Sequence, residues 1–244
     1  LDADARHLEQ LHCKFHGFRW GLEGQLHSIP CRWDFPQLSD EALRLPEARV
    51  GIWGGFVFIN MDPAAPSLED FLGVLPAHFA RWKLEDCWKA VHVAKVIPCN
   101  WKVTAEAFFE VYHFRFIHDR GGWSALDNRG ATMGLFPNGC SRMVTPFSKR
   151  AVEMRGMKDW SDFQKFSDPR FIDIPSVNNL IRSTSTAFSL FPNLIAPVAA
   201  YGYPFLMFWP IDKKTTRLDW VHYAPKNWEG DELPPHWQQR MDEF

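Results

Sequence analysis

The chain has 244 residues, of which 46% are hydrophobic, 23% charged and 15% aromatic, with 21 Phe and 12 Trp. This composition excludes a chain that is disordered throughout, because it supplies enough apolar surface to bury a sizeable core. The 27 Lys and Arg against 29 Asp and Glu leave a formal net charge of -2, so the excess of basic residues that binds a phosphate backbone is missing and we expect no nucleic acid partner.

The cysteines and the first residues indicate a compartment. Five cysteines are widely spread without a CxxC pair, which favours reduced thiols over a disulfide framework. The chain starts at Leu1 with neither an initiator Met nor a signal peptide, so we expect a cytoplasmic protein whose N-terminal part is missing. The uncharged stretch from Ser183 to Ile211 contains four prolines, which exclude a membrane-spanning helix, and we expect no membrane partner.

In chain order, the first 48 residues are polar and rich in turn residues, which is typical of a small β lobe. The apolar run Gly51 to Asn60 predicts one strand buried on both faces. Ser67, with Asp70 three residues later, predicts the start of a helix. The sequence changes from polar to apolar near the run Gly51 to Asn60, so we expect two domains, 1–48 and 49–244.

The second domain is expected to alternate strands with one long helix. The stretch from Asn100 to His118 has helix formers and neither Gly nor Pro, and predicts a helix through about Tyr112. Residues 119 to 180 are rich in Gly, Pro and Asn, and we expect irregular binding loops there. Alternation and short apolar runs bounded by proline predict strands at Trp88–Ile97, within Ser183–Ile211 and at Arg217–Tyr223.

A thiol and an imidazole lie three residues apart in Cys13-Lys-Phe-His16-Gly, and the glycines after them let the backbone turn tightly. A soft thiolate and an imidazole on one loop make half of a metal site, with zinc and iron–sulfur both open, and a buried Cys beside a surface His is the plain alternative. The other four cysteines have no ligand partner at a suitable spacing, so we expect them to be small buried residues: Cys31, Cys87, Cys99 and Cys140.

The Cys13 string resembles the second ligand pair of a Rieske iron–sulfur domain, although Phe18 stands where that family usually has Trp. The resemblance implies that Cys13 binds one iron of a 2Fe-2S cluster and His16 the other. The first ligand pair of the family, a Cys-x-His, should lie upstream, and His7 and His12 do not substitute for it. The chain as given therefore holds half of the cluster ligands.

A second constellation lies in the predicted helix. At about 100° per residue, Glu106, Glu110 and His113 fall on one helical face. His118 lies about 140° from His113 on an ideal helix, so the two imidazoles converge only if the helix ends or distorts between them. Several phenylalanines surround them, and a buried imidazole needs a hydrogen-bond partner or a metal.

The string from Asn100-Trp-Lys to Glu110-x2-His113-x4-His118 resembles the mononuclear-iron helix of Rieske non-haem iron oxygenases. The resemblance implies that His113 and His118 are two ligands of a 2-His-1-carboxylate Fe(II) site. It also implies that Glu110, where the family often has Asp, hydrogen-bonds a ligand histidine and links the iron to the cluster of a neighbouring subunit.

The third iron ligand should be an acidic residue near the C-terminus. Asp242 and Glu243 are the nearest candidates in the sequence. We favour a ligand beyond Phe244, in a chain that lacks this end as well.

As a whole, the chain resembles the large (alpha) subunit of a Rieske aromatic-ring-hydroxylating oxygenase. This implies an α+β fold, with part of a β Rieske lobe and a helix-grip (START-like) catalytic domain of curved antiparallel sheet and helices. It implies hydroxylation of an apolar, aromatic substrate with O2, electrons from a ferredoxin or reductase, and a homotrimer with or without a beta subunit. The excess of Trp and Phe fits the walls of an apolar pocket as well as plain core.

The residues alone leave two functions of other classes as alternatives to an oxygenase. The helix-grip fold also serves metal-free ligand carriers, against which the grouping of Glu110, His113 and His118 argues. A hydrolase with zinc at the same residues is the second alternative.

Overall fold

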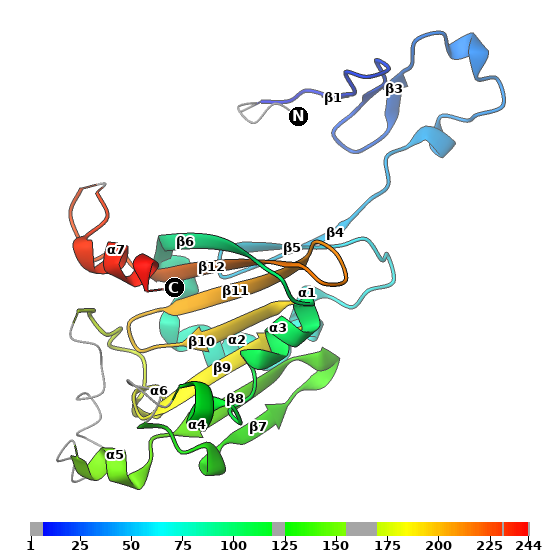
Figure 1. Ribbon diagram of the computed structural model, residues 1–244. Coiled ribbons are helices and arrows are strands. Elements are labelled where there is room, and N and C mark those ends of the chain that lie inside the picture. Colours follow the sequence, from blue (N-terminus) through cyan, green and yellow to red (C-terminus); the bar gives the residue numbers. More distant parts are fainter. Residues whose placement is uncertain (1–6, 119–124, 155–169, 231, 244) are drawn as a thin grey trace. The chain divides into compact units, whose positions relative to one another are not determined.

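The computed structural model describes residues 7–118, 125–154, 170–230 and 232–243 (Figure 1). The chain forms two compact units. The first comprises Leu1–Ile52 and Phe56–Ser67, and the second Trp53–Gly55 and Leu68–Phe244. Among the helices of the described residues, none has the length and apolar character needed to cross a bilayer.

The first unit contains a small antiparallel sheet in the order β1-β2-β3. Its strands are β1 Leu11–His12, β2 Arg19–Trp20 and β3 Leu26–Ser28, followed by the 3-10 turns η1 Arg32–Asp34 and η2 Glu41–Leu43. The indole Nε1 of Trp20 donates to the carbonyl of Leu43 at 2.8 Å, which ties the second turn to the sheet. The β character expected for this part of the chain is confirmed.

The apolar run Gly51 to Asn60 forms two strands, so the prediction of one strand buried on both faces is wrong. β4 Arg49–Trp53 and β5 Phe56–Asn60 pair as a hairpin around Gly54 and Gly55, whose φ angles are 57° and 85°. A Gly-Gly pair adopts these left-handed angles without steric cost, which is what a two-residue hairpin turn requires. The hairpin leaves its alternate residues exposed, namely Val50, Ile52, Val57 and Ile59.

The second unit is built on one antiparallel sheet of seven strands, in the order β6-β12-β11-β10-β9-β8-β7. The strands are β6 Cys87–Ile97, β7 Thr132–Leu135, β8 Ser141–Pro146, β9 Thr184–Leu190, β10 Leu194–Val198, β11 Tyr203–Pro210 and β12 Thr216–Pro225. The strands expected from alternation and from the proline-bounded apolar runs are thereby confirmed. Strands β7 and β8 lie within residues 119–180, where irregular loops were expected, so that expectation is wrong for this part.

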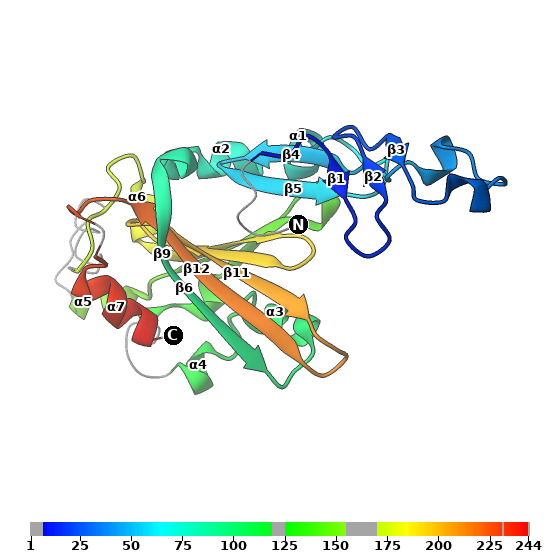
Figure 2. The same ribbon diagram turned by 90° about the horizontal axis from the view of Figure 1, so that it is seen from above.

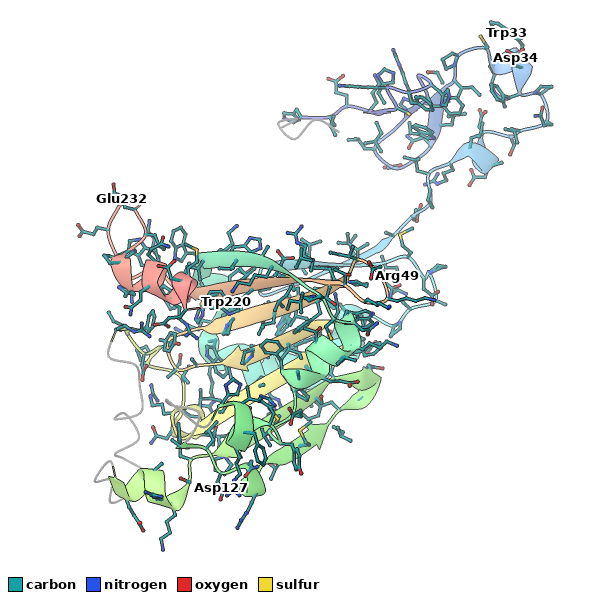
Figure 3. The ribbon with its side chains drawn as sticks, in the orientation of Figure 1. Trp33, Asp34, Arg49, Asp127, Trp220 and Glu232 are labelled. Atoms are coloured by element: carbon teal, nitrogen blue, oxygen red, sulfur yellow. The ribbon has the colours of Figure 1, made fainter. Side chains whose placement is uncertain are left out.

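Sequence pattern missed β7 and β8 because both are short and lie among Gly, Pro and Asn. Two helices also fall in this range, α5 Lys149–Met154 and α6 Asn179–Arg182, with the turns η6 Asn128–Gly130 and η7 Pro137–Gly139. Asp127, labelled in Figure 3, caps η6 by accepting from the backbone N–H of Arg129 at 3.1 Å. Residues 170–178 form neither helix nor strand, as expected, and 119–124 and 155–169 lie outside the described residues.

Helices cover both faces of the large sheet (Figure 2). On one face lie α1 Leu68–Leu72, which begins directly after Ser67 as predicted, and α2 Leu75–Phe79, with the turns η3 Ala80–Trp82 and η4 Leu84–Asp86. On the other lie α3 Trp101–Ala107, α4 Phe114–Ile117 and α7 Pro235–Asp242. A sheet covered on both faces explains why its strands β10 and β11 read as almost continuous apolar runs.

Phe79 is the centre of the core beneath α2. Its side chain is fully buried, and its ring centroid lies 4.8 Å from that of Phe188, 6.2 Å from Tyr203 and 6.4 Å from Phe205. Burying a phenylalanine of this kind stabilises the fold by roughly 1.5–3 kcal/mol.

The alternate strand residues form the core on the opposite face, beneath α3 and α7. Trp220, labelled in Figure 3, belongs to this core with Leu206, Phe208 and Trp237. Because strand side chains point alternately to the two faces, residues 206 and 208 of β11 pack here, whereas 203 and 205 pack against Phe79.

All five cysteines are described and carry free thiols. The expectation that four of them are buried holds for Cys140 alone. Cys31 is exposed at the start of η1 with a φ of 52°, and Cys87 and Cys99 are half-buried. Cys87 is the first residue of strand β6, and Cys99 follows the last residue of that strand, Ile97, by two positions.

Candidate functional site

The candidate site begins at the N-terminus of α3. Asn100 caps this helix, with its side-chain oxygen accepting from the backbone N–H of Lys102 at 3.0 Å. Its side-chain amide donates to the carbonyl of Lys213 at 2.9 Å, which ties the helix start to the turn between β11 and β12. At the far end the ring of Phe108 lies 5.6 Å from that of Phe208 on β11. The helix is therefore fixed to the sheet at both ends.

The helix ends at Ala107, so the predicted continuous helix through Tyr112 is wrong, and so is the common helical face of Glu106, Glu110 and His113. The carboxylate of Glu110 accepts hydrogen bonds from the backbone N–H groups of Tyr112 and of His113. A side chain that takes these donors competes with the helical backbone pattern and turns the chain. The sequence offers only a weak signal for this break, the two successive phenylalanines after Ala107, whose helix propensity is modest.

The two histidines flank the short helix α4. His113 occupies its N-cap position and His118 its C-cap position, where φ and ψ of -109° and 40° leave the helical region. Their ring centroids are 5.0 Å apart and both side chains are half-buried. The sequence required the helix to end or distort between these residues for the imidazoles to converge, and here α4 fills the positions between them and ends at Ile117, directly before His118.

Glu110 orients the first of these imidazoles. Its carboxylate oxygen Oε1 is hydrogen-bonded to Nδ1 of His113, in addition to its two backbone donors. Burial acts to raise the pKa of Glu110, but the hydrogen bonds from His113 and from the backbone of Tyr112 outweigh it, and the net pKa is lowered. An ionised carboxylate on Nδ1–H fixes the tautomer and leaves Nε2 of His113 as a metal-binding lone pair.

The carboxylates near the C-terminus do not join these histidines. Asp242 accepts from the side chain of Gln238 at 3.2 Å. Glu243 pairs with Arg170 at 2.6 Å and with Arg240 at 3.2 Å. The hydrogen bond from Arg170 is the largest cause of the lowered pKa of Glu243, and the bond from Arg240 lowers it further. Within the described ranges no group of three or more His, Cys, Asp or Glu side chains is arranged to hold a metal ion. The described residues thus bring together two imidazoles and an orienting carboxylate.

The Cys13 loop in the first unit has the geometry of a cradle. The backbone N–H of Cys13 donates to Phe18, and that of Gly17 donates to Cys13, both at 2.8 Å, while Gly17 adopts a φ of 76°. Backbone N–H groups of His16 first, and then of Phe15, point to the thiol and lower the pKa of Cys13. The loop therefore favours a thiolate, which is the form that ligates iron, and it leaves His16 exposed beside the ring of Phe15 at 4.0 Å.

Comparison with known proteins gives a family match. The family model described as "Ring hydroxylating alpha subunit (catalytic domain)" matches residues 76–244. The large oxygenase component of the naphthalene 1,2-dioxygenase system of Pseudomonas fluorescens is 31% identical over 160 residues, which are 59% of this chain and 34% of that protein. The carnitine monooxygenase oxygenase subunit of Escherichia coli strain K12 is 34% identical over 116 residues, 46% of this chain and 31% of that protein.

Solved structures show the same fold. The quaternary ammonium Rieske monooxygenase in complex with L-carnitine superposes with a TM-score of 0.65 at 18% identity, over 98% of this chain and 57% of that one. Naphthalene 1,2-dioxygenase with indole bound gives 0.61 at 23% identity, over 97% of this chain and 56% of that one. The expected α+β fold is thereby confirmed. The chain matches about a third of the length of these curated relatives, 34% and 31%.

Proposed function

Because the chain belongs to the family of ring-hydroxylating alpha subunits, we propose that it is the main part of a Rieske non-haem iron oxygenase. One observation of the structure carries the proposal. His113 and His118 converge at the two ends of α4, and Glu110 holds the first imidazole in the tautomer that ligates a metal. Two imidazoles with a carboxylate-bound Nδ1 suit a divalent iron with open coordination positions.

The donor set fits the implied metal in part. His113 and His118 would hold the iron, and a carboxylate outside the described residues would complete the set, since Asp242 and Glu243 are engaged elsewhere. When bound, this iron would supply the activation of O2 for hydroxylation. Glu110 keeps the His113 ring in position, and Phe108, at the end of α3, packs against Phe208 of β11.

The Cys13 loop would hold half of a Rieske 2Fe-2S cluster. Its backbone N–H groups stabilise the thiolate of Cys13, and His16 is exposed on the same turn. These two residues would ligate one iron each, and the other two ligands would come from outside this chain segment. Residues 1–48 would then be the C-terminal part of the Rieske domain and residues 49–244 the catalytic domain.

We further propose the partners that such a site needs. A ferredoxin or reductase would deliver electrons to the cluster, and Glu110 would link the iron to the cluster of a neighbouring subunit in a homotrimer, with or without a beta subunit. The substrate would be an apolar, aromatic small molecule, as the relatives named for naphthalene, chlorobenzene and biphenyl suggest. A cytoplasmic location fits these partners.

Metal analysis of the full-length protein with electron paramagnetic resonance tests the proposal. Iron with a Rieske spectrum supports it, whereas zinc as the bound metal points to a hydrolase and a metal-free protein to a ligand carrier. In the variant His113→Ala, we expect the mononuclear iron to be lost and the Rieske spectrum to remain.

Glu110→Gln tests the orienting carboxylate. The amide keeps the size of the side chain but removes its charge, so we expect both metals to be retained and turnover to fall by about 100-fold. Glu106→Gln, an exposed change one turn earlier on α3, is the matched control and should leave turnover unchanged. Wild-type turnover in Glu110→Gln would show that this carboxylate has no part in the reaction.

A further inference from the structure

The second unit contains a hollow of about 230 Å³ that the proposed oxygenase site does not use. It lies between α2 with η3 on one side and strands β8 and β9 with α6 on the other. Among the residues that line it are His78, Arg81, Trp82, Arg142, Thr186 and Phe188.

The hollow and the candidate iron site lie on opposite faces of the large sheet. Arg142 of β8 pairs in register with Phe188 of β9, so both side chains point to the α2 face. Their neighbours Met143 and Ala187 point the other way, into the core that packs against α3. Figure 2 shows α2 and α3 on the two sides of the sheet. A molecule in the hollow is therefore separated by the sheet from His113.

The hollow is positively charged. Two guanidinium groups, those of Arg81 and Arg142, border it, and the described residues that line it include no Asp or Glu. Within the described part of the chain, neither guanidinium forms an ion pair. Arg115, Arg129 and Arg150 of the same unit also form no ion pair within the described residues, but they are exposed, whereas Arg142 is half-buried without an acidic partner.

Two buried polar atoms at the hollow lack a partner within the described residues, Nε of Arg142 and Nδ1 of His78. A buried polar atom without a hydrogen bond destabilises the fold, so such atoms are normally satisfied by a ligand or by water. Burial first, and then the charge of Arg142, lower the pKa of His78, which leaves a neutral imidazole able to donate one hydrogen bond. A carboxylate can accept from the guanidinium and from the imidazole together.

Aromatic rings form the rest of the wall. The indole Nε1 of Trp82 already donates to the carbonyl of Ala199 at 2.8 Å, so its ring contributes apolar surface. Phe188 is buried, and its ring lies 5.8 Å from that of His78. A dry cavity of about 150 Å³ accommodates benzene, so a hollow of about 230 Å³ has room for one ring and a carboxylate.

We propose that this hollow is a second small-molecule site, which takes a single-ring aromatic carboxylate. The carboxylate lies between Arg142 and His78, and the ring packs against Trp82 and Phe188. Arg81, at the exposed rim, attracts the anion and contributes less to affinity.

Crystals of the full-length protein soaked with 4-bromobenzoate locate the ligand by the anomalous signal of its bromine. We expect a bromine peak in the hollow, beside Trp82 and Phe188. Calorimetry in solution should show that benzoate binds more tightly than benzamide or benzylamine, since the neutral amide and the cation lack the charge that the guanidinium groups recognise.

Arg142→Gln should weaken benzoate binding by at least about tenfold and leave benzamide binding unchanged. Arg81→Gln, on the exposed rim where folding is not at risk, should weaken it by a smaller factor. Arg150→Gln removes one exposed positive charge from α5, outside the hollow, and is the matched control. A bromine peak confined to the α3 face of the sheet, equal affinity for benzamide, or equal affinity for inorganic sulfate would each overturn the proposal.

Discussion

His222 should make the free energy of unfolding of the second unit depend on pH. Its side chain is fully buried against Tyr201, Trp220 and Trp237, with ring centroids 5.5, 5.8 and 5.0 Å away, and neither ring nitrogen has a partner within the described residues. Burial first, and then the charge of Arg240, lower its pKa from 6.5 to about 3. The native imidazole is therefore neutral at pH values where the unfolded chain is protonated.

The sign and size follow from proton linkage. Below pH 6.5 the unfolded state binds a proton that the native state does not bind until about pH 3, so stability is present above pH 6.5 and falls with pH through this window. The slope is about 1.4 kcal/mol per pH unit, which gives a loss of about 2 kcal/mol between pH 7 and pH 5.

Urea unfolding at pH 7 and pH 5 measures this loss. In His222→Leu, which keeps an apolar side chain of similar size, we expect the pH-dependent loss to be smaller than in the wild type by about 2 kcal/mol. Val221→Ala, at the neighbouring buried position of β12, is the control, because it should lower stability equally at both pH values. The same pH-dependent loss in His222→Leu as in the wild type would refute the reasoning.

Three further predictions concern the core beneath α2, the close contact of Gly202 with Tyr223, and the Cys13 loop. Phe79→Ala should lower the free energy of unfolding by about 3–5 kcal/mol in a urea titration, because it empties the centre of the core beneath α2; a loss below 1 kcal/mol would contradict the packing described. Gly202→Ala should lower the free energy of unfolding by about 1–3 kcal/mol, since a Cβ there would meet the carbonyl oxygen of Tyr223. Unchanged stability would contradict this close approach of Gly202 to Tyr223. Cys13→Ser in the full-length protein should abolish the Rieske spectrum and leave the mononuclear iron bound, and a normal spectrum would remove Cys13 from the cluster.

Strands β9, β10 and β11 of the large sheet were readable from the sequence, whereas β7 and β8 were not. Between Ser183 and Ile211 the uncharged runs are cut by proline and turn residues, and β9, β10 and β11 follow these cuts. A strand covered on both faces excludes charged side chains, so its uncharged pattern records its burial. The same rule failed at Gly51 to Asn60, where the Gly-Gly turn, and not the apolar run, decides the structure.

The candidate residues and their chemistry were likewise set by the sequence. The spacing of Glu110, His113 and His118 pointed to the candidate site and to the condition that the helix ends or distorts between the two histidines. Helix propensity did not show where the chain leaves the helix, because it counts residues one at a time. The break after Ala107 depends on the Glu110 carboxylate taking two backbone donors, which is an interaction between particular atoms.

The sequence by itself thus indicated five of the seven strands of the large sheet, β6 and β9 to β12, together with the family resemblance and the candidate metal-binding residues. Tertiary structure alone decided which of them meet. It placed His113 and His118 5.0 Å apart and engaged Glu243 with Arg170. It also gathered Arg81, Arg142 and His78, which no motif connects, around one hollow. Such groupings arise because strands distant in sequence pair in one sheet and send alternate side chains to the same face, and local sequence pattern carries no record of that pairing.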